Sequence, residues 1–177
     1  MKSRKNAAVI ALAVLMLFAA VSSGCGSPGR ENPVETMAPE DIAEKVCENV
    51  DVPTYEVRRL TSSDFEFFAF VPYDESLTAA AADALVNITP HSVVVIHAAR
   101  GNGASLAQKV AANADPNKWL CVGSEQVNVA YTDHYVLLVM SEKAMADAIT
   151  ENFKAMAKDL DGMEMTLLTV SNPRYEQ

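Results

Sequence analysis

The segment Ser92-Val-Val-Val-Ile-His-Ala98 carries the clearest structural signal in the chain. Its β-branched residues follow one another without a polar break, which is typical of a strand buried on both faces of a sheet. A second apolar run, Tyr135-Val-Leu-Leu-Val-Met140, has the same character. It follows the alternating segment 127–131 after a tight turn, so we expect these two segments to form a β-hairpin.

Helical patterns flank these strands. Pro39-Glu40-Asp41 predicts a helix start, because proline suits the first helical position and acids suit the positive end of the helix dipole. Apolar stripes predict helices over 104–113 and 142–160, the second ending at Gly162, before a last strand over 163–170 as a candidate edge. The order predicts an α+β fold: a single domain with a mixed or antiparallel sheet covered by helices.

Two segments between 51 and 90 allow more than one interpretation. The aromatic run 65–70 fits a short helix that Pro72 would end, and it also fits a strand; we favour the helix. The Ala-rich segment 77–86 is predicted to be helical from its propensity, with a strand as the alternative.

Length and composition bound the possible functions. The 177 residues fit one domain, and 50% hydrophobic residues with only 7 Gly and 8 Pro exclude a wholly disordered or collagen-like chain. The formal charge of −9 argues against general nucleic-acid binding, which needs a basic face.

The amino-terminal segment reads as a secretory signal. Positive charges at Lys2, Arg4 and Lys5 precede an apolar run over 7–21, and small residues follow. The run is shorter than the roughly 20 residues that an α-helix needs to cross a bilayer. An uncleaved anchor helix, or secretion with cleavage elsewhere, are the alternatives.

The end of this signal, Ser22-Ser23-Gly24-Cys25, resembles the lipobox of bacterial lipoproteins, with Ser22 where leucine is commonest. In that family the cysteine thiol receives a diacylglyceryl group, and the signal is cut just before the cysteine. The resemblance therefore implies removal of residues 1–24 and lipidation at Cys25. Two acyl chains suffice for stable membrane attachment.

The chain over about 39–156 also resembles an uncharacterised lipoprotein family of anaerobic Gram-positive bacteria, domain of unknown function 4358. The resemblance rests on the lipobox, the helix over 41–50, the strand before the helix around 106–110 and, best of all, the run 135–140 with the helix to Phe153. It implies an extracytoplasmic, lipid-anchored location at the cell membrane of a Gram-positive bacterium. The family has no assigned activity, so the resemblance implies no mechanism.

The expected organisation is a signal over 1–24, a lipidated cysteine and flexible tether over 25–37, and one α+β domain over 38–172. The tether is predicted because its Pro, Gly and polar residues bury too little apolar surface to offset the entropy of ordering. Removal of the signal leaves 11 basic and 23 acidic side chains, a formal charge of −12. We expect anionic lipid head groups to repel such a domain.

Candidate catalytic features are weak. The loop Arg100–Ser105 lies where phosphate-binding loops occur, but it has neither the lysine of a P-loop nor the third glycine of a dinucleotide motif. We interpret it as a turn with glycine at positive φ and with Asn102 or Ser105 capping the next helix.

The histidines and cysteines give no convergent site. His91 and His97 flank one strand, about 20 Å apart, and His134 lies in a turn, so no metal or cofactor is predicted. Cys47 and Cys121 both fall on predicted apolar faces, and whether they form a disulfide stays open.

The densest feature is an aromatic cluster: Phe65, Phe67, Phe68, Phe70 and Tyr73. One helical face cannot bury so many rings, so the cluster is a candidate binding surface. Burial of the rings on two sides, within the core, is the alternative.

Together these features predict a membrane-anchored extracytoplasmic lipoprotein whose domain is a non-enzymatic binding module for a protein, a peptide or an envelope component. The membrane is its expected partner through the lipid at Cys25, and no catalytic residue is predicted. The alternative is an accessory cell-envelope enzyme with a site built around His97, Cys121 or Ser105. A transport receptor is disfavoured because such proteins usually have two lobes.

Overall fold

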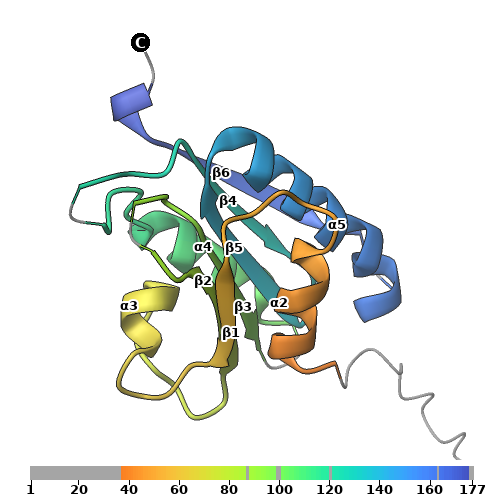
Figure 1. Cartoon of the computed structure of the whole chain (residues 1–177). Helices are drawn as coiled ribbons and strands as arrows, with labels where there is room; N and C mark the ends of the chain where they lie inside the picture. Colours follow the sequence, from red (N-terminus) through yellow and green to blue (C-terminus); the bar gives the residue numbers. More distant parts are fainter. Residues whose placement is uncertain (1–36, 87, 99–100, 120, 163, 176–177) are drawn as a thin grey trace, which may run out of the picture. The chain divides into compact units, whose positions relative to one another are not determined.

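The computed structural model of the chain describes residues 37–86, 88–98, 101–119, 121–162 and 164–175 (Figure 1). The predicted signal, Cys25 and all but Met37 of the predicted tether lie outside the described residues. The helices are α2 (Pro39–Cys47), α3 (Phe65–Ala69), α4 (Gly103–Asn113), α5 (Lys143–Asp161) and the 3₁₀ helix η1 (Pro173–Tyr175). The strands are β1 (Tyr55–Arg59), β2 (Thr78–Ala84), β3 (Ser92–His97), β4 (Gln126–Tyr131), β5 (Tyr135–Ser141) and β6 (Thr166–Ser171).

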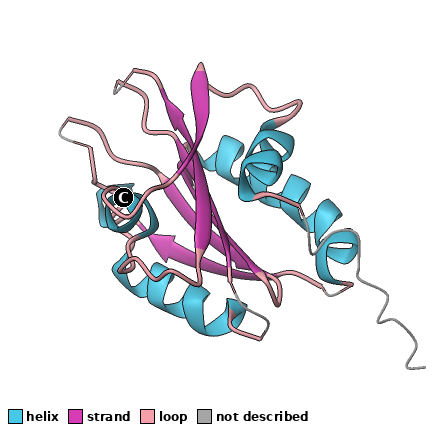
Figure 2. Ribbon diagram, turned by 90° about the horizontal axis from the view of Figure 1, so that it is seen from below, coloured by secondary structure: helices cyan, strands magenta, loops and turns pink. Residues whose placement is uncertain are grey.

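The six strands form one sheet in the order β1-β2-β3-β5-β4-β6, with every neighbouring pair antiparallel. Helices cover both faces (Figure 2). Because side chains alternate along a strand, one set of apolar residues packs with α3 and α4 and the other set packs with α2 and α5. The predicted α+β fold, a single domain with a helix-covered antiparallel sheet, is confirmed.

The strongest sequence patterns form the middle of the sheet. β3 and β5 pair directly, with Val94 opposite Leu138, and their apolar side chains are fully buried. β4 and β5 form the predicted hairpin, in which Val129 lies opposite Leu138. β6 lies at an edge beside β4, and Gly162 ends α5 at a φ of 67°.

The prediction of a helix over 77–86 is wrong. Residues 78–84 form β2, and Ala79 to Ala82 are buried between β1 and β3. Alanine favours helix only weakly as an intrinsic preference, and pairing with two neighbouring strands overrides it. The small side chains also let α2 approach the sheet, since Ala82 packs in one cluster with Ile42 and Val46.

β1 has no counterpart in the sequence analysis. Its sequence, Tyr-Glu-Val-Arg-Arg, contains three charged residues and pairs only with β2 among the described strands. Arg59 donates to Glu40 of α2 at 2.5 and 3.2 Å. Arg58 forms an ion pair with Asp64 and lies 4.7 Å from the ring centre of Phe68.

The turn before α4 is shaped by close packing. A side chain at Gly103 would place its Cβ only 2.0 Å from the backbone oxygen of Thr132, and the Gly103 N–H donates to the Asp133 carbonyl at 3.1 Å. Gly101 has the expected positive φ of 75°. Asn102 occupies the cap position but its side chain makes no capping hydrogen bond, so that part of the prediction is wrong.

Within the described ranges, no helix is long and apolar enough to cross a bilayer.

Candidate functional site

The edge strand β6 is the most accessible part of the sheet. One side pairs with β4 in the register Val129 to Leu168, and among the described residues no strand pairs with its other side. Its sequence, Thr-Leu-Leu-Thr-Val-Ser, contains no charge, and Leu167 is 44% exposed. Such a strand presents unpaired backbone N–H and C=O groups to any second extended chain.

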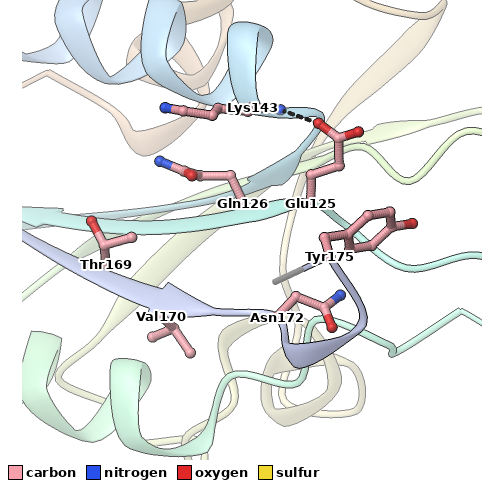
Figure 3. A pocket seen from close by; sticks show the side chains of 7 residues that line it. All are labelled: Glu125, Gln126, Lys143, Thr169, Val170, Asn172 and Tyr175. Carbon is pink, nitrogen blue, oxygen red and sulfur yellow. Dashed lines mark hydrogen bonds between the residues drawn. The ribbon is translucent and has the colours of Figure 1, made fainter. Parts of the chain in front are cut away.

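A cavity of about 390 Å³ opens at the carboxyl end of this strand (Figure 3). It lies on the surface between β6, the start of β4, the start of α5 and the 3₁₀ helix η1. The residues that line it are Glu125, Gln126, Lys143, Thr169, Val170, Asn172 and Tyr175.

The outer wall of the cavity is fixed by hydrogen bonds between η1 and the loop before β4. Asn172 is 2% exposed, and its side-chain amide donates to the Ser124 carbonyl at 2.7 Å while its oxygen accepts from the Arg174 N–H at 3.1 Å. The Tyr175 hydroxyl donates to the Gly123 carbonyl at 3.0 Å. The tyrosine ring is therefore held at the cavity although the residue remains 48% exposed.

The inner wall is a buried polar network between β4 and α5. The Gln126 amide donates to the side-chain oxygens of Asn128 and Asp147 at 3.1 and 3.0 Å. The fully buried Asn128 donates in turn to the Thr150 hydroxyl at 3.0 Å. These bonds satisfy buried polar groups and hold the position of Gln126 at the cavity.

Among the described residues, two charged side chains line the cavity, and they are oriented differently. Glu125 accepts a hydrogen bond from the backbone N–H of Lys143, at the start of α5, with a length of 3.0 Å. The ammonium of Lys143 lies 2.6 Å from Asp147, and Figure 3 shows this side chain pointing away from Glu125. The carboxylate of Glu125 is therefore the charged group that stands beside the Tyr175 ring.

The aromatic cluster predicted from the sequence divides between core and surface. Phe65 and Phe68 are 1% and 8% exposed and belong to the core below α3, against which Phe70 packs. Phe67 and Tyr73 are 60% and 45% exposed. Tyr73 packs edge to face on Phe65, at a centroid distance of 5.6 Å.

A buried lysine lies behind these rings, and sequence reasoning missed it. The side chain of Lys118 is 5% exposed and donates to the Ser92 hydroxyl at 2.8 Å. Its nitrogen lies 4.8 and 4.9 Å from the ring centres of Phe68 and Trp119, and 3.7 Å from Asp83. Burial lowers the pKa of Lys118 to about 8. We interpret the hydrogen bond from Lys118 to Ser92 as a structural contact that holds the loop after α4 against the sheet.

The histidines are distributed between two places. His91 is fully buried, with its Nδ1 3.1 Å from the Ser141 hydroxyl, and burial lowers its pKa to about 4. His97 stacks on His134 at 6.2 Å between ring centres, at the opposite end of β3. Among the described residues, no three histidine, cysteine or acidic side chains are grouped so that they could hold a metal ion.

In the cavities lined by the described residues, the side chains named for an enzymatic alternative do not come together. Ser105 lines one of about 210 Å³, and His97 lines another of about 200 Å³. Cys121 lines neither; it is exposed, which corrects its expected place on an apolar face. Cys47 is buried and both cysteines are free, and burial raises the pKa of the Cys47 thiol to about 12.

The comparisons with family models, curated proteins and solved structures give no match to the chain. The resemblance to the lipoprotein family and its lipobox therefore stays a prediction.

Proposed function

We propose that this chain is a membrane-anchored extracytoplasmic lipoprotein, held by lipid on Cys25, whose domain binds an extended segment of a partner protein without catalysing a reaction. The segment would add to the sheet as a seventh strand beside β6. The observation that carries the proposal is the uncharged, accessible edge of β6 with a polar cavity at its end.

Strand addition suits this edge physically. The backbone of the incoming segment supplies affinity through hydrogen bonds, while alternate side chains supply specificity. Each such bond contributes only about 0.5–1.5 kcal/mol net, so a six-residue strand needs further contacts from side chains. The cavity at Thr169 and Tyr175 offers a place for one of them.

The placement of this edge fits an anchored protein. Met37, where the described chain begins, accepts a hydrogen bond from Tyr135 at the start of β5. The cavity lies at the other end of the sheet, because Gln126 pairs with both Ser141, at the end of β5, and Ser171. A strand of seven residues spans about 23 Å, so the site is separated from the tethered end by the length of the sheet.

The occupant we propose is a partner's segment rather than a second copy of the chain. Two copies of the chain from Cys25 onward would each bring a formal charge of −12, and this repulsion opposes a contact as small as one short strand pair. Pro173, two residues after the end of β6, also limits the extension of this strand, since proline cannot continue a ladder.

The pairing is tested with the full chain in detergent and a neutral, fluorescent peptide, Ser-Thr-Val-Thr-norleucine-Thr-Val-Thr-Ser, acetylated and amidated. We expect saturable binding. N-methylation of alternate backbone nitrogens should weaken it at least tenfold in one of the two possible alternating patterns and little in the other, because a strand presents only every second N–H to its neighbour. Equal binding of the two N-methylated peptides would rule out strand addition.

A pair of protein variants locates the edge. Leu167→Lys with Thr169→Lys should reduce binding of the neutral peptide at least tenfold, because lysine on an edge strand opposes pairing. The matched control, Thr54→Lys with Ser62→Lys, adds the same charge at exposed positions near β1, at the opposite edge of the sheet, and should bind as the native chain does. A native dimer that the first pair abolishes would instead make a second copy the occupant.

The anchor is tested separately by mass spectrometry of the chain purified from membranes. We expect a diacylglyceryl group on Cys25 and no residues before it, and we expect Cys25→Ala to be released from the membrane fraction. A bare thiol at Cys25 in the native chain would contradict the anchoring.

A further inference from the structure

The geometry points to a lysine or arginine side chain of the bound segment as the occupant of the cavity at the end of β6, with the Glu125 carboxylate as its counter-charge and the Tyr175 ring beside it. This inference rests on the proposed strand addition and specifies which segments the edge would select.

The first argument is the distance that a long side chain of the added strand can span. Thr169 lines the cavity and lies on the face of the sheet that carries Asn128 and α5. A strand added beside β6 would run about 4.8 Å away, and its residues on that face would stand next to Thr169. A long side chain can contact diagonal neighbours about 7–8 Å away across paired strands. Lysine and arginine therefore extend far enough to enter the cavity from the added strand.

The second argument is the unused capacity of Glu125. Its carboxylate accepts from the Lys143 backbone N–H, whereas an ionised carboxylate offers about four acceptor positions. The cation that the described part of the chain brings to the cavity wall, the Lys143 ammonium, is directed to Asp147 at 2.6 Å. Arg174 belongs to η1 but does not line the cavity. The cavity thus holds a carboxylate that can accept further hydrogen bonds from an incoming cation.

The third argument is the aromatic wall. The hydrogen bond from the Tyr175 hydroxyl to the Gly123 carbonyl fixes one end of the ring, and the residue is still 48% exposed. A cation near the face of a fixed aromatic ring is attracted by the ring's electron distribution, and arginine and lysine are the residues that use this contact. Figure 3 shows the ring beside Glu125, so one cationic group can approach both.

The same geometry disfavours an anion. The start of α5 would attract an anion through its backbone N–H groups, but the carboxylate of Glu125 already occupies the Lys143 N–H. A second negative charge there would be repelled. The volume of about 390 Å³ lies at the lower end of the roughly 300–1,000 Å³ of small ligand sites, which suits one side chain.

The test compares three versions of the nine-residue peptide with norleucine, lysine or arginine at the central position, each bound to the full chain in detergent. Norleucine matches the lysine stem and lacks its charge. We expect the lysine and arginine peptides to bind at least tenfold more tightly than the norleucine peptide, and this advantage to shrink as salt rises.

Two variants assign the advantage to the cavity. Glu125→Gln should abolish the preference for lysine over norleucine, measured as the ratio of the two dissociation constants, because glutamine carries no charge while its oxygen can still accept from the Lys143 N–H. Tyr175→Leu should reduce the preference about threefold. The control Glu151→Gln removes an exposed carboxylate from α5 away from the cavity and should retain the preference.

The outcomes separate the inference from the function on which it rests. Equal binding of the lysine and norleucine peptides to the native chain, or a preference that persists in Glu125→Gln, would overturn the cation site while strand addition stands. If no peptide binds, the proposed strand addition fails and the cation site fails with it. The comparison of the lysine and norleucine peptides on the native chain needs no substitution. It therefore tests the inference even if a variant fails to fold.

Discussion

The two edges of the sheet differ in almost every property that governs pairing. β1 carries Glu56, Arg58 and Arg59 in five residues, and both arginines are held by carboxylates of neighbouring segments. β6 carries only threonine, leucine, valine and serine in six residues. Charged side chains on an edge strand oppose the approach of another strand, because pairing would bring them against its backbone and side chains. One edge is therefore protected against pairing, and the other remains available for it.

β3 lies in the middle of the sheet, between the two edge strands, and His91 directly precedes it. We expect protonation of His91 to lower the stability of the whole sheet, and therefore of both edges. His91 is fully buried just before β3, and burial lowers its pKa to about 4 from an ordinary value of about 6.5. Between these values the unfolded chain binds the proton and the folded chain does not. The folded state therefore loses stability as pH falls from 6.5 to 4, by on the order of 3 kcal/mol.

This loss is the largest effect we predict, and it should reach β1 and β6 together. Urea unfolding at pH 6.5 and 4.5 measures the free energy, and amide hydrogen exchange at the two edges shows where the sheet opens. His91→Gln should reduce the pH dependence, since glutamine does not titrate. If only one edge gains exchange at low pH, the sheet does not behave as one cooperative unit.

The difference between central and outer strands also explains which strands the sequence could predict. β3 and β5 are surrounded by the rest of the protein, so burial on both faces leaves continuous apolar runs that are easily recognised. β1 was missed because the charges that protect an edge also hide the strand pattern. β2 was misassigned because a run of alanines suits a helix by propensity alone. Its burial shows only in the assembled fold, where Ala82 packs with α2 and where Ala79 and Ala81 pack in the core on the opposite face.

The candidate site was beyond the reach of sequence patterns. The residues that line the site come from the loop before β4 and from three separate elements, and they have no characteristic spacing: Glu125, Lys143, Thr169 and Tyr175. The one available signal was the absence of charge in 165–170, within the strand that the sequence predicts over 163–170 as an edge. The sequence instead predicts the aromatic cluster as the binding surface, but Phe65 and Phe68 of that cluster pack in the core.

Removal of the charges from β1 tests whether these charges account for the difference between the two edges. Of the changes that we propose, we expect this one to alter stability least. In the variant Glu56→Thr, Arg58→Thr and Arg59→Thr, β1 acquires the uncharged character of β6. The free energy of unfolding should fall only slightly, because the two ion pairs that are lost are partly exposed, the Arg58 contact with the Phe68 ring lies beside them, and threonine suits a strand. Self-association should nevertheless rise, measured by light scattering over a range of concentrations.

The matched control, Glu44→Gln, Lys45→Gln and Lys109→Gln, makes the same change in net charge on exposed helix positions and should stay monomeric. If the β1 variant also stays monomeric, charge is not what keeps that edge unpaired, and the lack of charge on β6 no longer argues for strand addition. If it associates through β1, the neutral peptide should bind at two edges instead of one. The Leu167→Lys and Thr169→Lys pair would then remove only half of the sites, which ties the selectivity of the native chain to three charged residues on the opposite edge.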